Sequence, residues 1–202
     1  MATTYTGLLA EVASYLSRSD LTSTIPTFVQ LGQARINRDV RCKEMVTKNA
    51  SFSITGEYVN VPSDFLEVKH FYLNTSPRKS LEPMDANTMT DAFPNTDTEP
   101  RYFSVEAGQF RFSPTPSGTV TATLIYYAKP VTLVTTSAET NVLFPTVAPD
   151  LYLYASLLEA ESFIQNDPRL ATWGQAYERG VAALNSAAKG SRHGGPLTTR
   201  PG

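Results

Sequence analysis

Residues suited to nucleophilic or acid–base chemistry are few and widely separated in this chain. It contains two histidines, His70 and His193, and a single cysteine, Cys42. A serine or cysteine nucleophile needs an imidazole that a third group orients. His70 alternates with apolar neighbours on an expected strand, His193 falls in the C-terminal segment, and Cys42 has no histidine near it in the sequence. We therefore predict that His70 is a sheet-surface residue and that Cys42 is an unreactive thiol.

The acidic residues form neither a recognisable metal loop nor a catalytic pair. The stretch DANTMTD (residues 85–91) places oxygen-bearing side chains at odd spacings, as a calcium loop does, but Met89 stands where an oxygen ligand belongs. Glu159 and Glu161 are two residues apart, so on a helix they face different directions. We expect no metal, no cofactor and no enzyme activity, and a small enzyme of unrecognised type is kept only as a competing interpretation.

A cationic helix is the strongest remaining feature. The stretch PTFVQLGQARINRDVRCKEM (residues 26–45) carries three arginines and a lysine in its last eleven positions. Arg35 and Asp39 have the spacing of an ion pair along one helix, whereas Arg38 and Arg41 share another face. The start of this helix lacks base-reading polar residues, and no aromatic platform for single strands is evident. An arginine-rich protein interface explains the pattern better than a nucleic-acid reader or an anion clamp.

The overall charge does not name a ligand. The 202 residues contain 17 lysines and arginines and 19 acids, so the formal charge is −2 and no basic field attracts nucleic acid. Charged residues make up 18% of the chain, below the ~25% usual for soluble proteins, which suits a surface covered by partners. One cysteine excludes an internal disulfide, and neither a signal peptide nor a membrane-spanning apolar run is apparent. We expect a protein made in the cytosol.

The hydrophobic period changes from that of helices to that of strands and back along the chain. Helices are predicted over 4–18, from Pro26 toward residue 45, over 146–166 and over 168–190, and the last three have a cap residue or proline at their start. The segment between them predicts a hairpin over 52–61, a short helix over 85–93, a hairpin over 102–112 and a long strand over 119–128. The third of the four main helices is apolar on most sides, so we expect it at the centre of the helices.

The expected fold is α+β. Two N-terminal and two C-terminal helices form a discontinuous helical bundle, residues 1–45 and 146–190, and an antiparallel β domain, residues 46–145, is inserted between them. Residues 191–202 form an extended tail rich in glycine and proline, with two arginines and no acid. Such a composition does not order itself in water, so a neighbouring chain is its expected partner.

Four stretches together resemble a known family of structural virion proteins. They are QARINRDVRCKEM, GEYVNVPSDFLEV, SPTPSGTVTATLIYYAKPVTL and PDLYLYASLLEAESFIQNDPRLATWGQAYERGVAAL, and they span nearly the whole chain. In their order and spacing they resemble the head-to-tail adaptor (connector, or tail adaptor) proteins of tailed bacteriophages, chiefly those with short tails. None of the four is a catalytic signature.

The resemblance implies a ring, usually a dodecamer, bound beneath the portal protein of the capsid. Such a ring continues the DNA channel toward the tail nozzle or tail fibres, and the genomic DNA passes through during ejection without specific binding. It implies that helical bundles pack side by side, that the β domain projects toward the tail and that a C-terminal extension docks on the portal. The expected location is the neck of the virion, after assembly in the host cytoplasm and without a membrane.

A ring requires two different complementary patches on each subunit. We hypothesise that arginines of the second helix pair with acids of a neighbouring copy and that arginines of the tail contact the portal. The residues of this hypothesis are Arg38, Arg41, Glu159, Glu161, Glu178, Arg192 and Arg200. The alternative function is a β-domain binding module of the phage tail, for fibre or receptor attachment, which would expose an aromatic patch and work without a ring.

Overall fold

The chain forms two compact units. The structure is a computed structural model, and it describes residues 2–18, 20–92, 98–134, 140–164 and 167–190. One unit is helical and is built from the chain up to Met45 and from Pro130 onward; the other, Val46–Lys129, contains the strands. The predicted α+β class is confirmed. Residues 130–134 and 140–145, which we expected in the β domain, belong to the helical unit.

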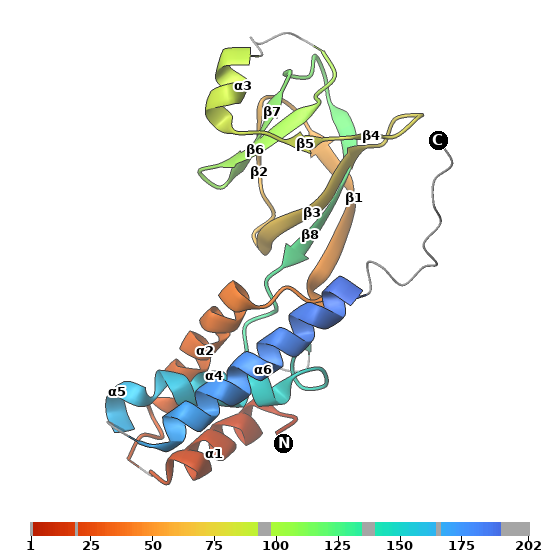
Figure 1. The fold of residues 1–202 in the computed structure, drawn as a ribbon. Helices are drawn as coiled ribbons and strands as arrows, with labels where there is room; N and C mark the ends of the chain where they lie inside the picture. Colours follow the sequence, from red (N-terminus) through yellow and green to blue (C-terminus); the bar gives the residue numbers. More distant parts are fainter. Residues whose placement is uncertain (1, 19, 93–97, 135–139, 165–166, 191–202) are drawn as a thin grey trace. The chain divides into compact units, whose positions relative to one another are not determined.

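The helical unit is arranged around one apolar helix. Its helices are α1 (Tyr5–Leu16), α2 (Ile25–Asp39), α4 (Pro149–Glu159), α5 (Glu161–Ile164) and α6 (Arg169–Gly190), and a 3-10 turn, η1 (Lys43–Met45), follows α2 (Figure 1). α4 packs against α1, α2 and α6, so the predicted central position of this helix is confirmed.

The ends of the helices follow local rules. The Thr4 side chain accepts a hydrogen bond from the Gly7 amide at 3.1 Å, and Pro26 lies in the first turn of α2. Asp167 accepts from the Arg169 amide at 2.9 Å at the start of α6. The predicted third helix is wrong at its end, because it stops at Glu159 and α5 follows as a separate short helix.

α2 and α4 approach closely at Gly32. A methyl group on Gly32 would lie 2.9 Å from the amide nitrogen of Ser156 and 3.0 Å from the carbonyl carbon of Ala155. Both are backbone atoms, so they cannot move aside unless the helix itself shifts. Glycine at this position therefore sets the distance between the two helices.

Next to Gly32, the buried side chain of Gln33 holds the chain where it re-enters the helical unit. Its Nε2 group donates to the carbonyls of Pro130 and Val131 at 3.2 and 3.0 Å, and its Oε1 accepts from the Leu133 amide at 2.9 Å. A strand partner would supply the same kinds of group, so Gln33 satisfies backbone that has no sheet beside it. This explains why the segment after residue 129 joins the helices.

A second buried amide extends this network. Asn141 donates to the Val131 carbonyl at 2.5 Å and accepts from the amides of Leu143 and Phe144 at 2.9 and 3.0 Å. The hydroxyl of Tyr152 on α4 also donates to Asn141, at 3.2 Å. The loop is thereby tied to itself and to the central helix by side chains that are buried.

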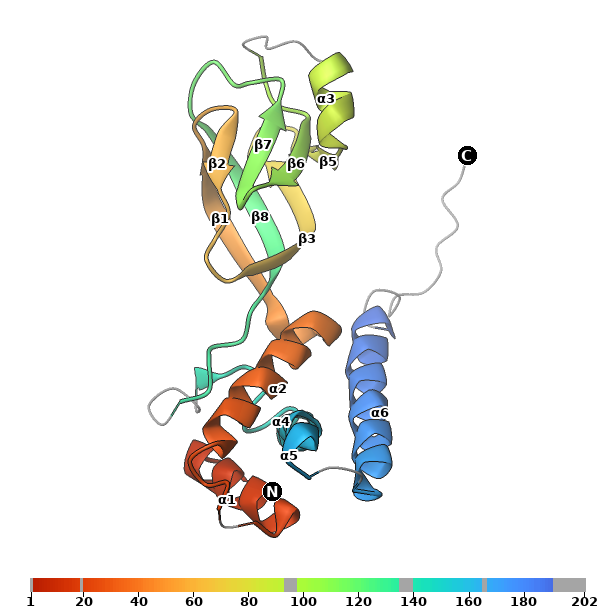
Figure 2. The same cartoon turned by 90° about the vertical axis from the view of Figure 1, so that its left-hand side faces the viewer.

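Two four-stranded sheets make up the second unit. The first sheet has the order β1 (Val46–Ile54), β8 (Val120–Ala128), β3 (Phe65–Leu73), β4 (Lys79–Ser80). The second has the order β2 (Tyr58–Asn60), β7 (Gln109–Ser113), β6 (Tyr102–Glu106), β5 (Glu82–Pro83), and the short α3 (Ala86–Ala92) packs on β6 (Figure 2). All described pairs are antiparallel except β5 with β6.

One predicted hairpin is confirmed and the other is wrong. β6 and β7 pair through a turn in which Ala107 and Gly108 both have positive φ, at 46° and 77°, as a two-residue hairpin turn of the favoured twist requires. β1 and β2 do not pair, because β1 joins β8 and β2 joins β7 in the other sheet. The turn after Ile54 therefore carries the chain from one sheet to the other. The long strand β8 is confirmed.

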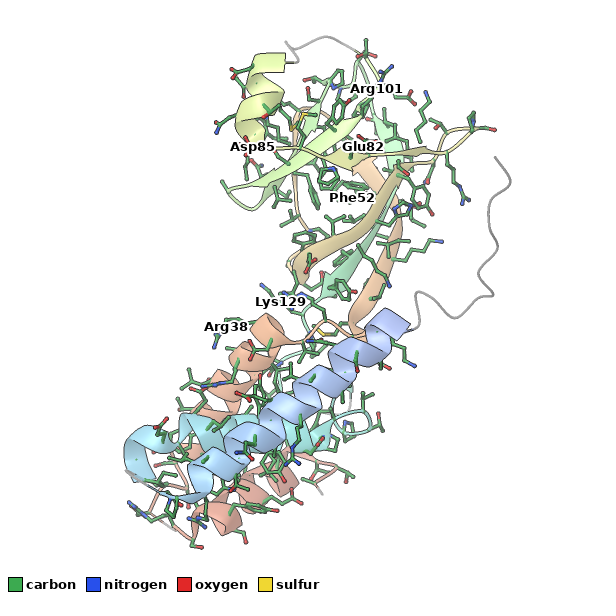
Figure 3. All side chains as sticks on the ribbon, in the orientation of Figure 1. Arg38, Phe52, Glu82, Asp85, Arg101 and Lys129 are labelled. Atoms are coloured by element: carbon green, nitrogen blue, oxygen red, sulfur yellow. The ribbon has the colours of Figure 1, made fainter. Side chains whose placement is uncertain are left out.

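Phenylalanines fill the space between the sheets. Phe71 lies at the centre of this core, 5.5 Å from Phe52, 5.5 Å from Phe103, 5.4 Å from Phe110 and 5.7 Å from Phe112 between ring centroids. Most of these pairs are edge-to-face, the geometry that aromatic quadrupoles favour. Figure 3 shows Phe52 on the inner side of its strand.

We predict that Gly32→Ala lowers the free energy of unfolding by about 1–3 kcal/mol, because overpacking forces α2 and α4 apart. Gly174→Ala on α6 is the control, since its nearest neighbour is Leu158 Cδ2 at 3.9 Å. That change should instead add about 0.5–1 kcal/mol, because alanine favours a helix. Urea unfolding followed by fluorescence of Trp173, the chain's only tryptophan and buried on α6, measures both. Equal effects of the two substitutions would contradict the close approach.

We also predict that Gln33→Ala destabilises the helical unit by about 2–4 kcal/mol, because it leaves a buried amide and a buried carbonyl unpaired. Gln30 lies exposed on the same helix, so Gln30→Ala should change stability by less than about 0.5 kcal/mol. The same urea titration compares the two. A Gln33→Ala protein as stable as Gln30→Ala would show that the returning segment does not need its anchor.

Candidate assembly surfaces

Two of the residues that could do chemistry, Cys42 and His70, belong to different units, and His193 lies outside the described residues. Cys42 is buried, and burial, with a hydrogen bond to Glu44, raises its pKa to about 11. A thiol that stays protonated at neutral pH is a poor nucleophile. His70 is exposed on β3, its ring 5.2 Å from that of Tyr72, as predicted for a sheet-surface residue.

Neither a metal centre nor a membrane span is found in the part of the chain that the structure describes. There, no three His, Cys, Asp or Glu side chains gather closely enough to hold an ion. None of the described helices combines the length and the apolar character needed to cross a bilayer. The calcium-like stretch begins α3, where Asp85 Oδ2 accepts from the Asn87 amide at 3.1 Å, so this carboxylate caps a helix.

The arginines of the cationic helix have different surroundings. Arg35 Nε binds Glu159 Oε1 on α4 at 2.7 Å, so the predicted partner Asp39 is wrong. Arg41 Nη1 donates to the carbonyls of Asn37 and Val40 at 2.8 and 2.7 Å, at the end of its own helix. Cationic groups favour this end of a helix, where carbonyls lack partners.

Asp39, freed from that expected pair, helps to fix α6 on α2. The Tyr177 hydroxyl donates to Asp39 Oδ2 at 2.7 Å, and burial, reinforced by this hydrogen bond, raises the pKa of Tyr177. Asn185 donates to the Asp39 carbonyl at 2.9 Å and accepts from the Arg41 amide at 2.8 Å. One side chain of α6 thus satisfies a carbonyl and an amide at the end of α2.

The remaining residues of the charge hypothesis are exposed or undescribed. Arg38 projects from the last turn of α2 into solvent (Figure 3), and Glu161 and Glu178 are exposed as well. Arg192 and Arg200 lie outside the described residues. Glu159, the other acid of the set, is paired within the subunit with Arg35 of α2.

An exposed apolar face lies beside Arg38 on α2. Leu31 is 46% exposed, and Phe163 on α5 is 47% exposed while its ring packs edge-on against Phe28 at 5.1 Å. Phe28, Leu31 and Arg38 follow one another at spacings of three and seven, so they share one side of the helix. We call Leu31, Arg38 and Phe163 the Leu31 face.

A second exposed apolar face is made by the loop that Gln33 anchors. Val131, Val134, Val142 and Val147 are each 38–46% exposed. They belong to a segment folded back on itself, since Asn141 bonds the carbonyl of Val131. We call these four residues the valine face. The segment from 130 to 150 contains two acids and neither lysine nor arginine.

The two faces lie on opposite sides of α2. Leu31 and Gln33 are two residues apart, which is about 200° around an α-helix. Gln33 binds the backbone that carries the valine face, so the Leu31 face points the other way. Each subunit therefore presents two different patches, one that includes an exposed arginine and one on a segment whose sequence contains acids and no base.

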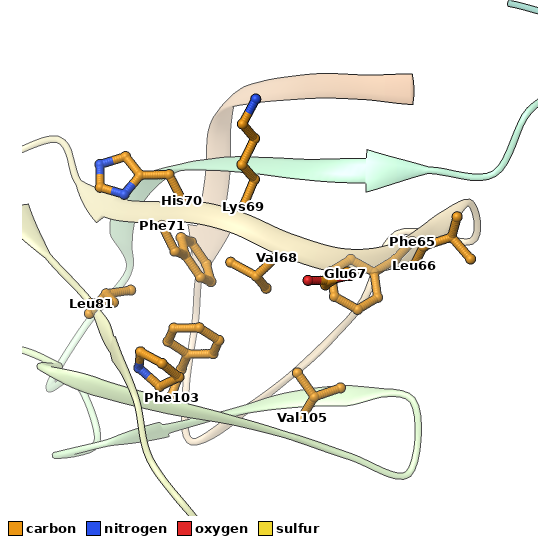
Figure 4. Close-up of a pocket in the computed structure, with 11 residues that line it drawn as sticks. Phe65, Leu66, Glu67, Val68, Lys69, His70, Phe71, Leu81, Phe103 and Val105 are labelled. Carbon is orange, nitrogen blue, oxygen red and sulfur yellow. The ribbon is translucent and has the colours of Figure 1, made fainter. Parts of the chain in front are cut away.

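The second unit carries a groove of about 420 Å³ between its two sheets. β3 supplies one wall and β6 the other, with Leu81 between them (Figure 4), and Pro83 also lines the groove. Its lining is apolar for the most part, and Figure 4 shows Lys69 and His70 directed to the side of β3 away from Phe103 and Val105. This surface suits apolar groups of a partner better than a charged small molecule.

The surfaces described so far suit association with other proteins. A family model described as SU10 adaptor protein matches residues 3–200, nearly the whole chain. The chain belongs to the SU10 adaptor protein family. A search of curated proteins found no match. As an SU10 adaptor the chain is a structural protein of the phage head–tail connection, and the predicted adaptor family is confirmed at this level.

Membership in the SU10 adaptor family also implies partners and a place. Phage portal and tail proteins are the implied partners, and the neck of the virion is the implied location. The short-tailed type of phage stays a prediction.

The sequence indicated the cationic helix but not the residues that make the two faces. Leu31 fits the pattern of α2, although nothing in its spacing shows that it lacks a partner. The valine face depends on a loop fold that Gln33 imposes from a distant position and Asn141 from within the loop. An isolated glutamine on an apolar helix face, beside a glycine, was the one available signal.

Proposed function

We propose that the SU10 adaptor chain forms a closed ring, of twelve copies, between the portal protein and the nozzle or fibres of a short phage tail. The ring continues the channel through which DNA is ejected. The helical unit joins neighbouring copies, and assembly takes place in the host cytoplasm. Family membership supports the place of the ring, and the resemblance to short-tailed phage adaptors supports the copy number.

The observation that carries this proposal is the pair of different faces on opposite sides of α2. A ring is built from heterologous contacts, in which one patch of a subunit meets another patch of the next. The Leu31 face and the valine face have this relation, and both bring apolar groups to the contact. Arg38 then meets a segment that carries acids and no base.

Three charged residues are kept as candidates at the ring contact and two are reassigned. Arg38, Glu161 and Glu178 are exposed and available to a neighbour. Glu159 and Arg41 have partners within the subunit, so we assign them to holding α2 against α4 and to closing the end of α2. Replacing either residue is therefore expected to lower the stability of the subunit, so such a variant would not test assembly by itself.

The channel needs no specific contact with DNA. Tight phosphate binding by many lysines and arginines would slow ejection, because each contact adds to affinity. The formal charge of −2 gives the chain no basic excess to supply such contacts. We propose that DNA passes without sequence recognition.

We predict that the two faces complement each other between subunits. Leu31→Asp removes one face, and Val131→Asp with Val142→Asp removes the other, so each variant alone should be monomeric. A mixture should form a dimer of one copy each, because only one intact contact then remains possible. Native mass spectrometry over a concentration series, with the wild-type chain forming larger assemblies, measures this.

The control for this experiment is Gln30→Asp, an exposed position about 100° from Leu31 on the same helix. This variant should assemble like the wild type. A wild-type chain that stays monomeric throughout, a Leu31→Asp chain that still assembles, or a mixture without the dimer would each contradict the ring contact.

The tail is proposed to bind the portal through Arg192 and Arg200. A chain that ends at Gly190 should keep its fold and its contacts with other copies but lose binding to the portal of the same phage, by tenfold or more. The double variant Arg192→Ser and Arg200→Ser keeps the length of the tail and removes its two arginines, so it shows how much of the portal binding depends on their charge. Pull-down with purified portal measures binding, and undiminished binding by the truncated chain would end this part of the proposal.

A further inference from the structure

The groove of the β unit lies between β3 and β6. The segment that contains β4 and β5 connects the edges of these two strands, but only along part of their length. Leu81 donates to the Phe71 carbonyl at the edge of β3, and Glu82 donates to the Arg101 carbonyl beside β6, both at 2.9 Å. The chain thus crosses from one sheet edge to the other within two residues. Beyond this crossing, no described strand covers the two edges, and the groove begins there.

The edge of β6 is the one that can accept another strand. β5 pairs with β6 only at Tyr102 and Phe103, and the Met84 amide donates to the Phe103 carbonyl at 2.9 Å. Backbone groups two residues apart point the same way, so Val105 directs its N–H and carbonyl outward along the same edge. The register of β6 with β7 has no irregularity, which keeps this edge straight.

The facing edge of β3 is unsuitable for pairing. Its register with β8 shifts between Phe65 and Glu67 and again between Val68 and His70. Two bulges in a few residues bend a strand and spoil its edge as a template. β3 therefore contributes side chains to the groove, whereas β6 contributes the backbone N–H and carbonyl groups to which another strand can bond.

We propose that this groove binds an extended apolar segment of a different protein, which adds to β6 beside Val105 as a strand in line with β5. Its alternate side chains enter the groove between Val68 and Val105, in the manner of strand addition to a sheet edge. Val105 is 49% exposed although it lies on the same side of β6 as the buried Phe103. An incoming strand would cover it.

Neither the described strands nor residues 191–202 offer a suitable segment. The described strands already have partners in their own sheets. Residues 191–202 contain one apolar residue, Leu197, whereas alternate insertion needs at least two. The occupant is therefore a second protein, with apolar residues at every other position. This inference does not depend on the ring, since a monomer would present the same groove.

The test displays overlapping twelve-residue peptides from every protein of the phage, this chain included, on yeast. They are selected for binding to the wild-type chain and counter-selected on Val105→Asp. We expect enriched peptides from another protein with alternating apolar residues, and at least tenfold weaker binding to Val105→Asp. Gln30→Asp, which adds the same charge at an exposed position outside both faces and the groove, is the control and should bind as the wild type does.

A second measurement tests the strand itself. N-methylation of the one peptide amide that bonds Val105 should abolish binding, whereas N-methylation of the next residue should not, because its amide points away. Three results would each overturn the proposal. They are that no peptide is enriched over the counter-selection, that only segments of this chain are enriched, and that N-methylation at either position has the same effect on binding. Circular dichroism confirms that Val105→Asp remains folded.

Discussion

The buried amide of Gln33 is the contact on which the arrangement of the helical unit depends. The chain leaves this unit at Met45 and returns at Pro130, and the returning backbone has no sheet to satisfy it. Gln33 supplies two donors and an acceptor from the middle of α2. The adjacent glycine lets α4 approach on the next side of the same helix. One turn of α2 thus positions the loop that carries the valine face, the central helix and, on its remaining side, Leu31.

The β unit follows a different constraint. Its aromatic core is closed around Phe71, but the strands that join the sheets on one side, β4 and β5, are only two residues each. Apolar side chains beyond them stay partly exposed because the chain turns into α3 instead of continuing as a strand. A sheet edge that is regular and uncovered is a hazard in an isolated protein, and proteins usually blunt it. Here one edge is blunted by bulges and the other is not.

Local patterns in the sequence predicted most elements, and contacts between distant residues account for the errors. The cap at Asp167, the β6–β7 turn and the apolar third helix all follow from neighbouring residues. The prediction of the first hairpin was wrong because the sequence pattern of two strands joined by a turn is the same in both cases. It does not show whether the second strand pairs with the first or joins a different sheet. The Arg35 pair was wrong because spacing along one helix ignores a carboxylate on the next. The two faces and the groove depend on which residues remain uncovered, and periodicity does not report that.

The central claim is that copies of this SU10 adaptor meet through opposite sides of α2. The most direct measurement is a cryo-electron microscopy reconstruction of the chain bound to the portal of its phage. The account predicts a closed ring in which Leu31 and Phe163 of each copy contact the segment 131–147 of the next, with Arg38 at the rim of that contact. A ring in which both faces point to solvent, or in which like faces meet in pairs, would contradict it.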